Sequence, residues 1–98
     1  MPGLRFEWDK GKEAANRRKH HVSFEEASSV FSDERALLID DQDHSMDEDR
    51  FIIMGLSVSL KVLVVCHCYR AGDNVIRIIS ARKADRSERE EYFKRWKT

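Results

Sequence analysis

The sequence predicts an α+β fold: a short N-terminal strand, two helices, an antiparallel meander of three or four strands and a C-terminal helix. Two observations lead to this prediction. Helix signals occupy residues 9–33, whereas the alternation that is typical of strands occupies residues 36–81. Helices and strands separated in this way form α+β domains, with the helices on one face of the sheet. The chain of 98 residues is expected to form a single domain over residues 1–98.

The N-terminal part is predicted to contain a short strand and a surface helix. Arg5–Trp8 alternates between polar and apolar residues, and Asp9 is a suitable N-cap for a helix over Lys10–His21. Lys, Glu, Ala and Arg in this segment are good helix formers. Because Ala14 and Ala15 are nearly its only apolar residues, we expect this helix to lie on the surface and to display its cations.

The second helix has the clearest local signals. Ser23 and Glu26 match a capping box, and Val22 and Ala27 occupy the staple positions around it. Apolar residues at helical spacing then form one face, and Ser32-Asp33 ends the helix: Phe24, Ala27, Val30 and Phe31.

Strands and one more helix complete the prediction. The expected strands are Ala36–Asp40, Arg50–Leu56, Lys61–Tyr69 and Val75–Ala81, the last two joined by a turn. Asp85 and Glu88 repeat the capping pattern and open a terminal helix that carries three aromatic residues, Tyr92, Phe93 and Trp96.

Composition limits the possible function classes. Lys+Arg 18 and Asp+Glu 18 give zero net charge, so the chain lacks the overall basic charge that is common in nucleic-acid binders. The charges are nevertheless unevenly spread: acids crowd into residues 40–49, and bases into residues 10–21 and 77–86. A basic face therefore remains possible. No apolar run approaches membrane-spanning length and no secretory signal is evident, so we expect a cytoplasmic protein without membrane contact.

Cysteine and histidine invite a metal site, but their spacing argues against one. In Cys66-His67-Cys68 the histidine points away from both sulfurs if the segment is a strand, and no CxxC or HExxH pattern occurs. The thiols lie in the most apolar strand, where burial raises the thiol pKa and makes cysteine inert. We therefore expect no metal, no cofactor and no cysteine nucleophile.

The last predicted strand carries arginines in an apolar setting. Arg77 stands among Val and Ile residues, and Arg82 follows at the end of the strand. A guanidinium group stays charged and matches phosphate or carboxylate with its planar fork of donors, so an anion site is indicated. Strict alternation would put Arg77 and Arg82, five residues apart, on opposite faces. They share a site only if a bend or a strand end intervenes near Ala81.

Other charged residues have both a simple and a functional interpretation. Arg77 either pairs with a carboxylate such as Glu48 or lines a pocket. Glu48 and Arg50 lie on one side of the predicted strand, where they form either an ordinary ion pair or part of a site. Lys19 and His20 either complement the helix dipole in solvent or face the sheet, where histidine is a natural general acid or base.

The aromatic residues of the terminal helix also leave two interpretations open. Tyr92, Phe93 and Trp96 either dock the helix on the sheet or present rings to a partner, since Trp and Tyr are typical interface anchors.

Taken in order, these residues resemble the BrnT family over nearly the whole chain. The motifs are Phe6-Glu7-Trp8-Asp9, Asn16 with Lys19-His20, Val22-Ser23-Phe24-Glu25-Glu26-Ala27 with Val30-Phe31, Asp43-His44-Ser45, Glu48 with Arg50-Phe51, Gly55, and Arg77-Ile78-Ile79-Ser80-Ala81-Arg82. The resemblance implies a RelE-like ribonuclease fold and the toxin of a type II toxin–antitoxin pair. It also implies a BrnA-like ribbon-helix-helix antitoxin that would bind the toxin in a hetero-oligomer and contact the operator DNA.

On this basis we expect a metal-independent endoribonuclease that inhibits translation. The 2′-OH of RNA would be the nucleophile, and the products would be a 2′,3′-cyclic phosphate and a 5′-OH end. Arg77 and Arg82 would hold the phosphate and stabilise its added charge. Arg50 would assist them, held by Glu48.

Lys19 or His20 would act as general base or acid in this reaction. Trp8 would stack on a base, unless it only packs beside the first helix, and Lys83 would contact RNA. Two other interpretations remain: a non-catalytic binding module that grips nucleic acid or an acidic protein, and a structural subunit that assembles through Tyr92, Phe93 and Trp96.

Overall fold

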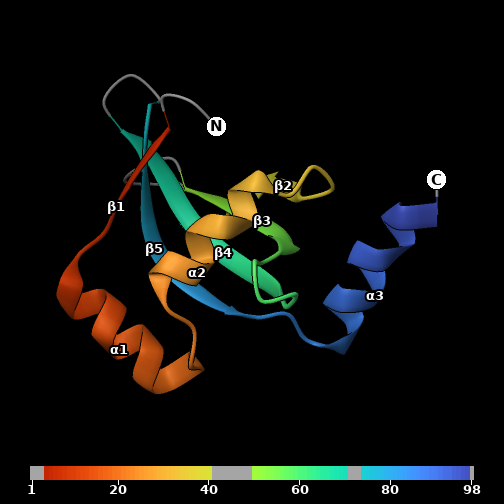
Figure 1. The fold of residues 1–98 in the computed structure, drawn as a ribbon, viewed down its shortest axis with the longest axis horizontal. Helices are drawn as coiled ribbons and strands as arrows, with labels where there is room; N and C mark the ends of the chain where they lie inside the picture. The colour runs from red at the N-terminus through yellow and green to blue at the C-terminus, as the bar shows by residue number, and fades with distance from the viewer. Residues whose placement is uncertain (1–3, 41–49, 71–73, 98) are drawn as a thin grey trace.

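The computed structural model describes residues 4–40, 50–70 and 74–97, which form one mixed sheet with helices around it (Figure 1). The elements in chain order are β1 (Arg5–Glu7), α1 (Lys10–His20), α2 (Phe24–Ser29), the 3₁₀ helix η1 (Val30–Ser32), β2 (Leu37–Asp40), β3 (Phe51–Leu56), β4 (Val62–Arg70), β5 (Val75–Lys83), α3 (Arg86–Lys94) and the 3₁₀ helix η3 (Arg95–Lys97). The α+β prediction is confirmed.

Among the described residues the sheet has the strand order β1-β5-β4-β3-β2. Strands β2 to β5 form the predicted antiparallel meander, in which Phe51 lies opposite His67. Strand β1 adds to the edge of β5 in parallel, with Arg5 opposite Val75. This parallel pair joins the N-terminal strand to the last strand of the meander and leaves the second half of β5 without β1 beside it.

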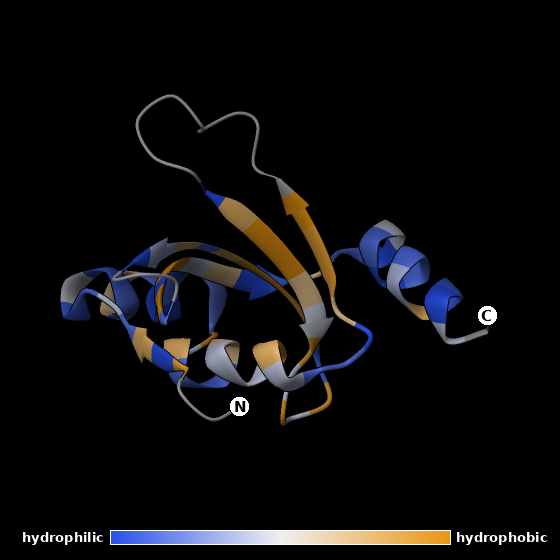
Figure 2. Cartoon of the chain, turned by 90° about the horizontal axis from the view of Figure 1, so that it is seen from above, coloured by the Kyte–Doolittle hydropathy of each residue, from blue (hydrophilic) through white to orange (hydrophobic). Residues whose placement is uncertain are grey.

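The main core lies between α2, η1 and one face of the sheet. Phe24, Ala27 and Val30 are fully buried, as the apolar spacing predicts. They pack on apolar residues of β3, β4 and β5 that share one side of the pleat: Ile53, Leu63, Val65, Ile76, Ile78 and Ala81. Figure 2 shows that the strands carry most of the hydrophobic residues, while α1 and α3 are largely hydrophilic.

The terminal helix packs on the opposite face of the sheet, so the prediction that all helices cover one face is wrong. Tyr92 is fully buried and forms a second core cluster with residues of the other pleat side: Met54, Val62, Val64 and Ala84. The reason lies in the chain path, because the backbone turns at Ala84 directly after β5, where its N–H donates to Val62 O. Figures 1 and 2 show α3 standing apart from α1 and α2.

Side-chain caps fix where the helices begin. Asp9, Ser23 and Asp85 each accept a hydrogen bond from the backbone N–H three residues ahead, as predicted. The capping box is complete at Asp85, whose backbone N–H donates to Glu88. At Ser23 the expected second half differs, because the Glu26 carboxylate accepts from the Ser57 hydroxyl instead. No helix in the described part of the chain is long and apolar enough to span a membrane.

Candidate active site

A β-bulge places Arg77 and Arg82 on the same face of the sheet. Opposite β4, Arg77 pairs with Cys68 and Ile78 with His67, but the next residue of β4, Cys66, pairs with Ser80. Ile79 is therefore the extra residue, and the alternation of β5 shifts by one after it. The bend that a shared arginine site requires thus occurs at Ile79, before Ala81.

The two arginines lie on the face opposite the main core, and we call this face the open face. Arg82 lies opposite Val64, four residues from Cys68 along β4. At about 3.3 Å per residue, the two backbones are about 13 Å apart. Ser80 lies between them and is exposed. Of the described elements, only α3 packs on this face, next to Met54, Val62 and Val64.

Carboxylates from neighbouring elements hold both arginines. Arg77 Nη1 donates to Glu7 Oε2 at 2.8 Å, and Arg70 Nε lies 3.5 Å from the same oxygen. The carboxylate that pairs with Arg77 is therefore Glu7 on β1, and Glu48 lies outside the described residues. Arg82 donates through two nitrogens to Glu88, at 2.8 and 2.9 Å. This hydrogen bond from Arg82 is the main cause that lowers the pKa of Glu88 to about 2.

Arg50 belongs to the same face by its position. It directly precedes β3, two residues before Ile52, which lies opposite Cys66. The alternation of β3 therefore places Arg50 on the open face, on the side of the sheet that carries Arg77 and Arg82. Its side chain is partly buried.

Asn16 fastens α1 to the edge of β5, a role for which the sequence contains no local signal. Its Nδ2 donates to Ala81 O at 2.8 Å and to Val22 O at 3.0 Å, while its Oδ1 accepts from Ala81 N at 3.1 Å. The carboxamide thus replaces the peptide group of a neighbouring strand where β1 has ended. Ala14 and Ala15 are exposed, so this buried polar side chain, and not apolar packing, anchors the helix.

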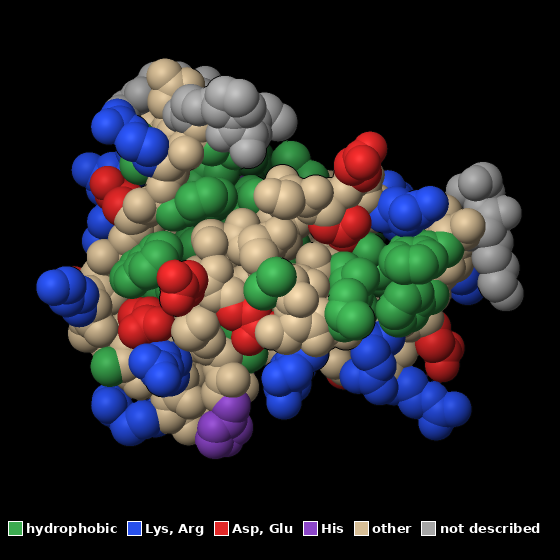
Figure 3. Space-filling model, viewed as in Figure 1, with side chains coloured by type: hydrophobic (Ala, Val, Ile, Leu, Met, Phe, Trp, Pro, Cys, Tyr) green, Lys and Arg blue, Asp and Glu red, His purple; other side chains and the backbone are tan. Residues whose placement is uncertain are grey.

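The anchor brings the last turn of α1 to the end of β5. His20 lies one turn beyond Asn16 on the same side of the helix and is partly buried, whereas Lys19 is exposed. The turn is closed by His21, which has a left-handed backbone (φ 61°) and donates its N–H to Arg17 O. Figure 3 shows Lys and Arg side chains around α1, with Asp and Glu side chains beside them, and further Lys and Arg side chains around α3.

Two residues predicted to bind RNA lie on the side of the sheet that carries the main core, opposite the open face. Lys83 shares the side of Ala81 and is exposed. Trp8 is partly buried and packs edge-on against the Phe24 ring, with ring centroids 6.0 Å apart. Part of the indole ring is thus buried by packing against α2, and the rest is accessible.

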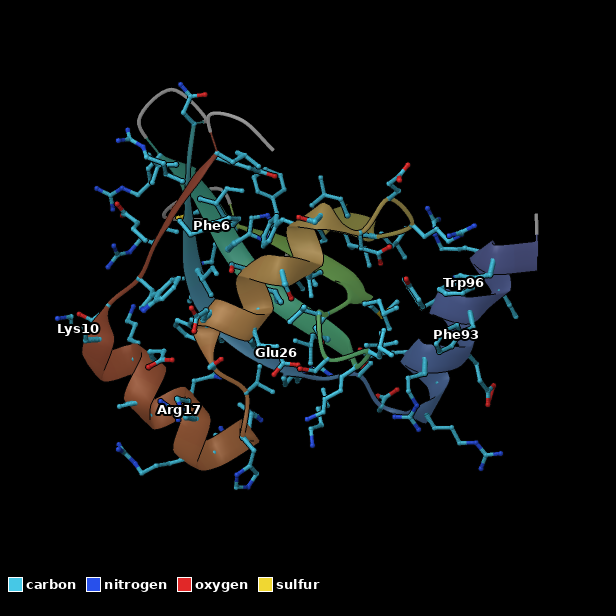
Figure 4. The ribbon with its side chains drawn as sticks, in the orientation of Figure 1. Phe6, Lys10, Arg17, Glu26, Phe93 and Trp96 are labelled. Atoms are coloured by element: carbon cyan, nitrogen blue, oxygen red, sulfur yellow. The ribbon has the colours of Figure 1, made fainter. Side chains whose placement is uncertain are left out.

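The aromatic residues of the terminal helix divide into two roles. Tyr92 is fully buried, and its hydroxyl donates to Asp33 Oδ2 at 2.5 Å, so it docks the helix and is not available to a partner. Phe93 and Trp96 are 41% and 44% exposed and contact each other along α3 and η3 (Figure 4). Arg35 lies over the Trp96 ring, 4.8 Å from its centroid.

The thiols and His67 lie on opposite sides of β4, as alternation predicts. Cys68 is buried and Cys66 partly buried on the open face, while His67 is fully buried against the Phe31 ring on the other. Burial of the ring lowers the pKa of His67 to about 4, against a smaller opposing effect of its hydrogen bond to Val65 O. Within residues 4–40, 50–70 and 74–97, no group of three or more His, Cys, Asp or Glu is placed to hold a metal ion.

A family model described as the ribonuclease toxin BrnT of type II toxin–antitoxin systems matches residues 8–88. The chain is also similar to the crystal structure of the Brucella abortus ribonuclease toxin BrnT, with a TM-score of 0.63 and 22% identity, over 85% of this chain and 99% of that chain. At this identity the likeness shows a shared fold. A search of curated proteins found no match.

Proposed function

Since the chain belongs to the family of BrnT ribonuclease toxins of type II toxin–antitoxin systems, we propose that it is a metal-independent endoribonuclease whose open face binds RNA. The observation that carries this proposal is the bulge at Ile79, which puts Arg77 and Arg82 on one face. Guanidinium groups are suited to phosphate, because each presents a planar fork of donors that stays charged.

The reaction needs no group beyond RNA and the side chains of the protein. The 2′-oxygen attacks the neighbouring phosphorus, and the bond between phosphorus and the 5′-oxygen breaks. A general base takes the proton of the 2′-OH, and a general acid gives a proton to the leaving 5′-oxygen. The products are a 2′,3′-cyclic phosphate and a 5′-OH end. Lys19 and His20 are the candidates for these proton transfers, which typically contribute about 10²–10⁴-fold.

The arginines would stabilise the charge that develops on the phosphate. Because the backbones of Arg77 and Arg82 lie about 13 Å apart, we propose that they contact neighbouring phosphates of one strand. Arg50, which directly precedes β3, would assist from the same face of the sheet. Glu48 would orient Arg50. Preorganised cations of this kind typically contribute several kcal/mol to catalysis. Lys83 and the accessible part of Trp8 lie on the opposite side of the sheet from Arg77 and Arg82, so they would contact flanking RNA where the strand passes around the edge of the sheet.

The antitoxin partner would use a different part of the surface. The family implies an antitoxin, and we propose that it is a BrnA-like ribbon-helix-helix protein that also contacts the operator DNA. Phe93 and Trp96 support a protein contact on α3, because exposed aromatic residues are typical interface anchors. The toxin and the antitoxin would then form a hetero-oligomer.

The test is cleavage of end-labelled RNA by the purified protein in EDTA, with analysis of both product ends. Cyclic phosphate and 5′-OH ends are expected. Cleavage that requires a divalent ion, or products with 5′-phosphate ends, would refute the proposed mechanism. RNA that is bound in a gel shift but remains intact would instead favour a non-catalytic binding module.

A further inference from the structure

The ion pair between Arg82 and Glu88 has the geometry of a filled phosphate site. Two guanidinium nitrogens of Arg82 face the two carboxylate oxygens of Glu88, at 2.8 and 2.9 Å. Two oxygens of a phosphodiester would take the same side-on position on an arginine fork. Arg77 differs, because Glu7 meets it through a single nitrogen and lies within 3.5 Å of Arg70 as well.

Glu88 reaches Arg82 from a separate element. It stands in the first turn of α3, where its Oε1 also accepts from Asp85 N at 2.9 Å. A groove of about 310 Å³ opens beside the pair, with an apolar floor that includes Ile52 and Val64. The side chains of Arg82 and Glu88 are 43% and 30% exposed, so solvent and ligands reach the pair and weaken it.

We propose that the Glu88 carboxylate occupies the phosphate position of Arg82, and that Glu88 thereby sets the affinity of the open face for RNA. This inference rests on the proposed function, since it assumes that RNA is the ligand of this face. An RNA phosphate must displace the carboxylate, and the low pKa of Glu88 means that the carboxylate is ionised at neutral pH. The Glu88 carboxylate, in the first turn of α3, therefore competes with RNA for Arg82.

The test compares two substitutions that remove the same charge from α3. Glu88→Gln removes the competing carboxylate but keeps an oxygen that accepts from Asp85 N, so the cap is retained. Glu90→Gln is the matched control, because Glu90 pairs with the exposed Arg86 on the same helix. Affinity is measured by fluorescence anisotropy with a short 2′-O-methyl RNA, which cannot be cleaved, and thermal denaturation confirms the fold of each variant.

We expect Glu88→Gln to bind this RNA about tenfold more tightly than the wild type, and Glu90→Gln to stay within about twofold. The gain should vanish in the double variant Arg82→Ala Glu88→Gln, because it acts through Arg82. Equal affinity of Glu88→Gln and Glu90→Gln would overturn the inference, since only net charge would then matter.

A second measurement separates this inference from the proposed function. Inorganic phosphate is titrated into wild type and Glu88→Gln while the Arg82 Nε–H signal is followed by NMR. A shift of this signal at lower phosphate concentration in Glu88→Gln supports the competition even if no variant binds RNA, an outcome that would refute the RNA-binding function alone. The same phosphate dependence in both proteins would overturn the competition at Arg82.

Discussion

Replacing Asn16 by alanine is expected to lower the free energy of unfolding by about 3 kcal/mol. The carboxamide makes three hydrogen bonds to the main chain, two with Ala81 and one with Val22. Each contributes about 1 kcal/mol net, and the groups left behind are buried, which adds to the loss. For a domain of this size, the change corresponds to a fall in Tm of about 15 °C. Urea and thermal denaturation followed by circular dichroism measure both quantities.

The second asparagine of the chain provides the control. Asn74 is exposed, so Asn74→Ala should change stability by less than about 0.5 kcal/mol. Asn16→Asp should be at least as destabilising as Asn16→Ala at neutral pH, because a carboxylate would face two carbonyl oxygens without a donor. A loss below about 1 kcal/mol in Asn16→Ala would refute the conclusion that this side chain anchors α1.

Three further predictions concern the core. The folded-state pKa of His67 is about 4, below the ordinary value of 6.5, so its contribution to stability is complete above pH 6.5 and is lost as the pH falls toward 4. Urea denaturation should show a loss of about 3 kcal/mol over this range that is absent in His67→Phe; parallel curves for the two proteins would contradict this. Gly55→Ala should destabilise by about 1–3 kcal/mol, since a Cβ would lie 2.9 Å from Val30 Cγ1, and an unchanged Tm would show that the site relaxes. Tyr92→Phe should lower the free energy of unfolding by about 2 kcal/mol, because it removes the hydrogen bond to Asp33; substitutions on the exposed side of α3 should lower it less. Thermal denaturation that shows no loss would exclude this bond as the anchor of the helix.

Local signals in the sequence were sufficient for the helix starts and for the fold class. Asp9, Ser23 and Asp85 cap the three helices as predicted, because capping depends on residues only three positions apart. The strands of the meander follow from alternation and turn residues. Their ends differ from the expected positions by one or two residues, and β5 continues two residues further, to Lys83.

The bulge could not be located from the sequence. Ile78 and Ile79 are both apolar, so the alternation is ambiguous at the point where it shifts. Only the pairing of β5 with β4 decides that Ile79 is the extra residue. The spacing of Arg77 and Arg82 alone therefore pointed to opposite faces, although the two side chains share one.

Polar contacts between residues that are far apart in the sequence also cannot be predicted from local sequence patterns. Asn16 and Ala81 are separated by 65 positions, Glu7 and Arg77 by 70, and Tyr92 and Asp33 by 59. Such pairs are created by the packing of elements that the sequence predicts separately. For the same reason, the side of the sheet on which α3 packs was not predicted correctly.

The proposal that the open face of the sheet cleaves RNA is tested by the single-turnover cleavage rate of an Arg77→Ala Arg82→Ala variant. The matched control is Arg86→Ala Lys94→Ala, which removes two exposed cations from α3. Circular dichroism confirms that both variants are folded. We expect a loss of at least about 100-fold in the first variant, since cations placed at the developing charge are removed, and little change in the control. Equal rates in the wild type and both variants would contradict the assignment of the active site to this face.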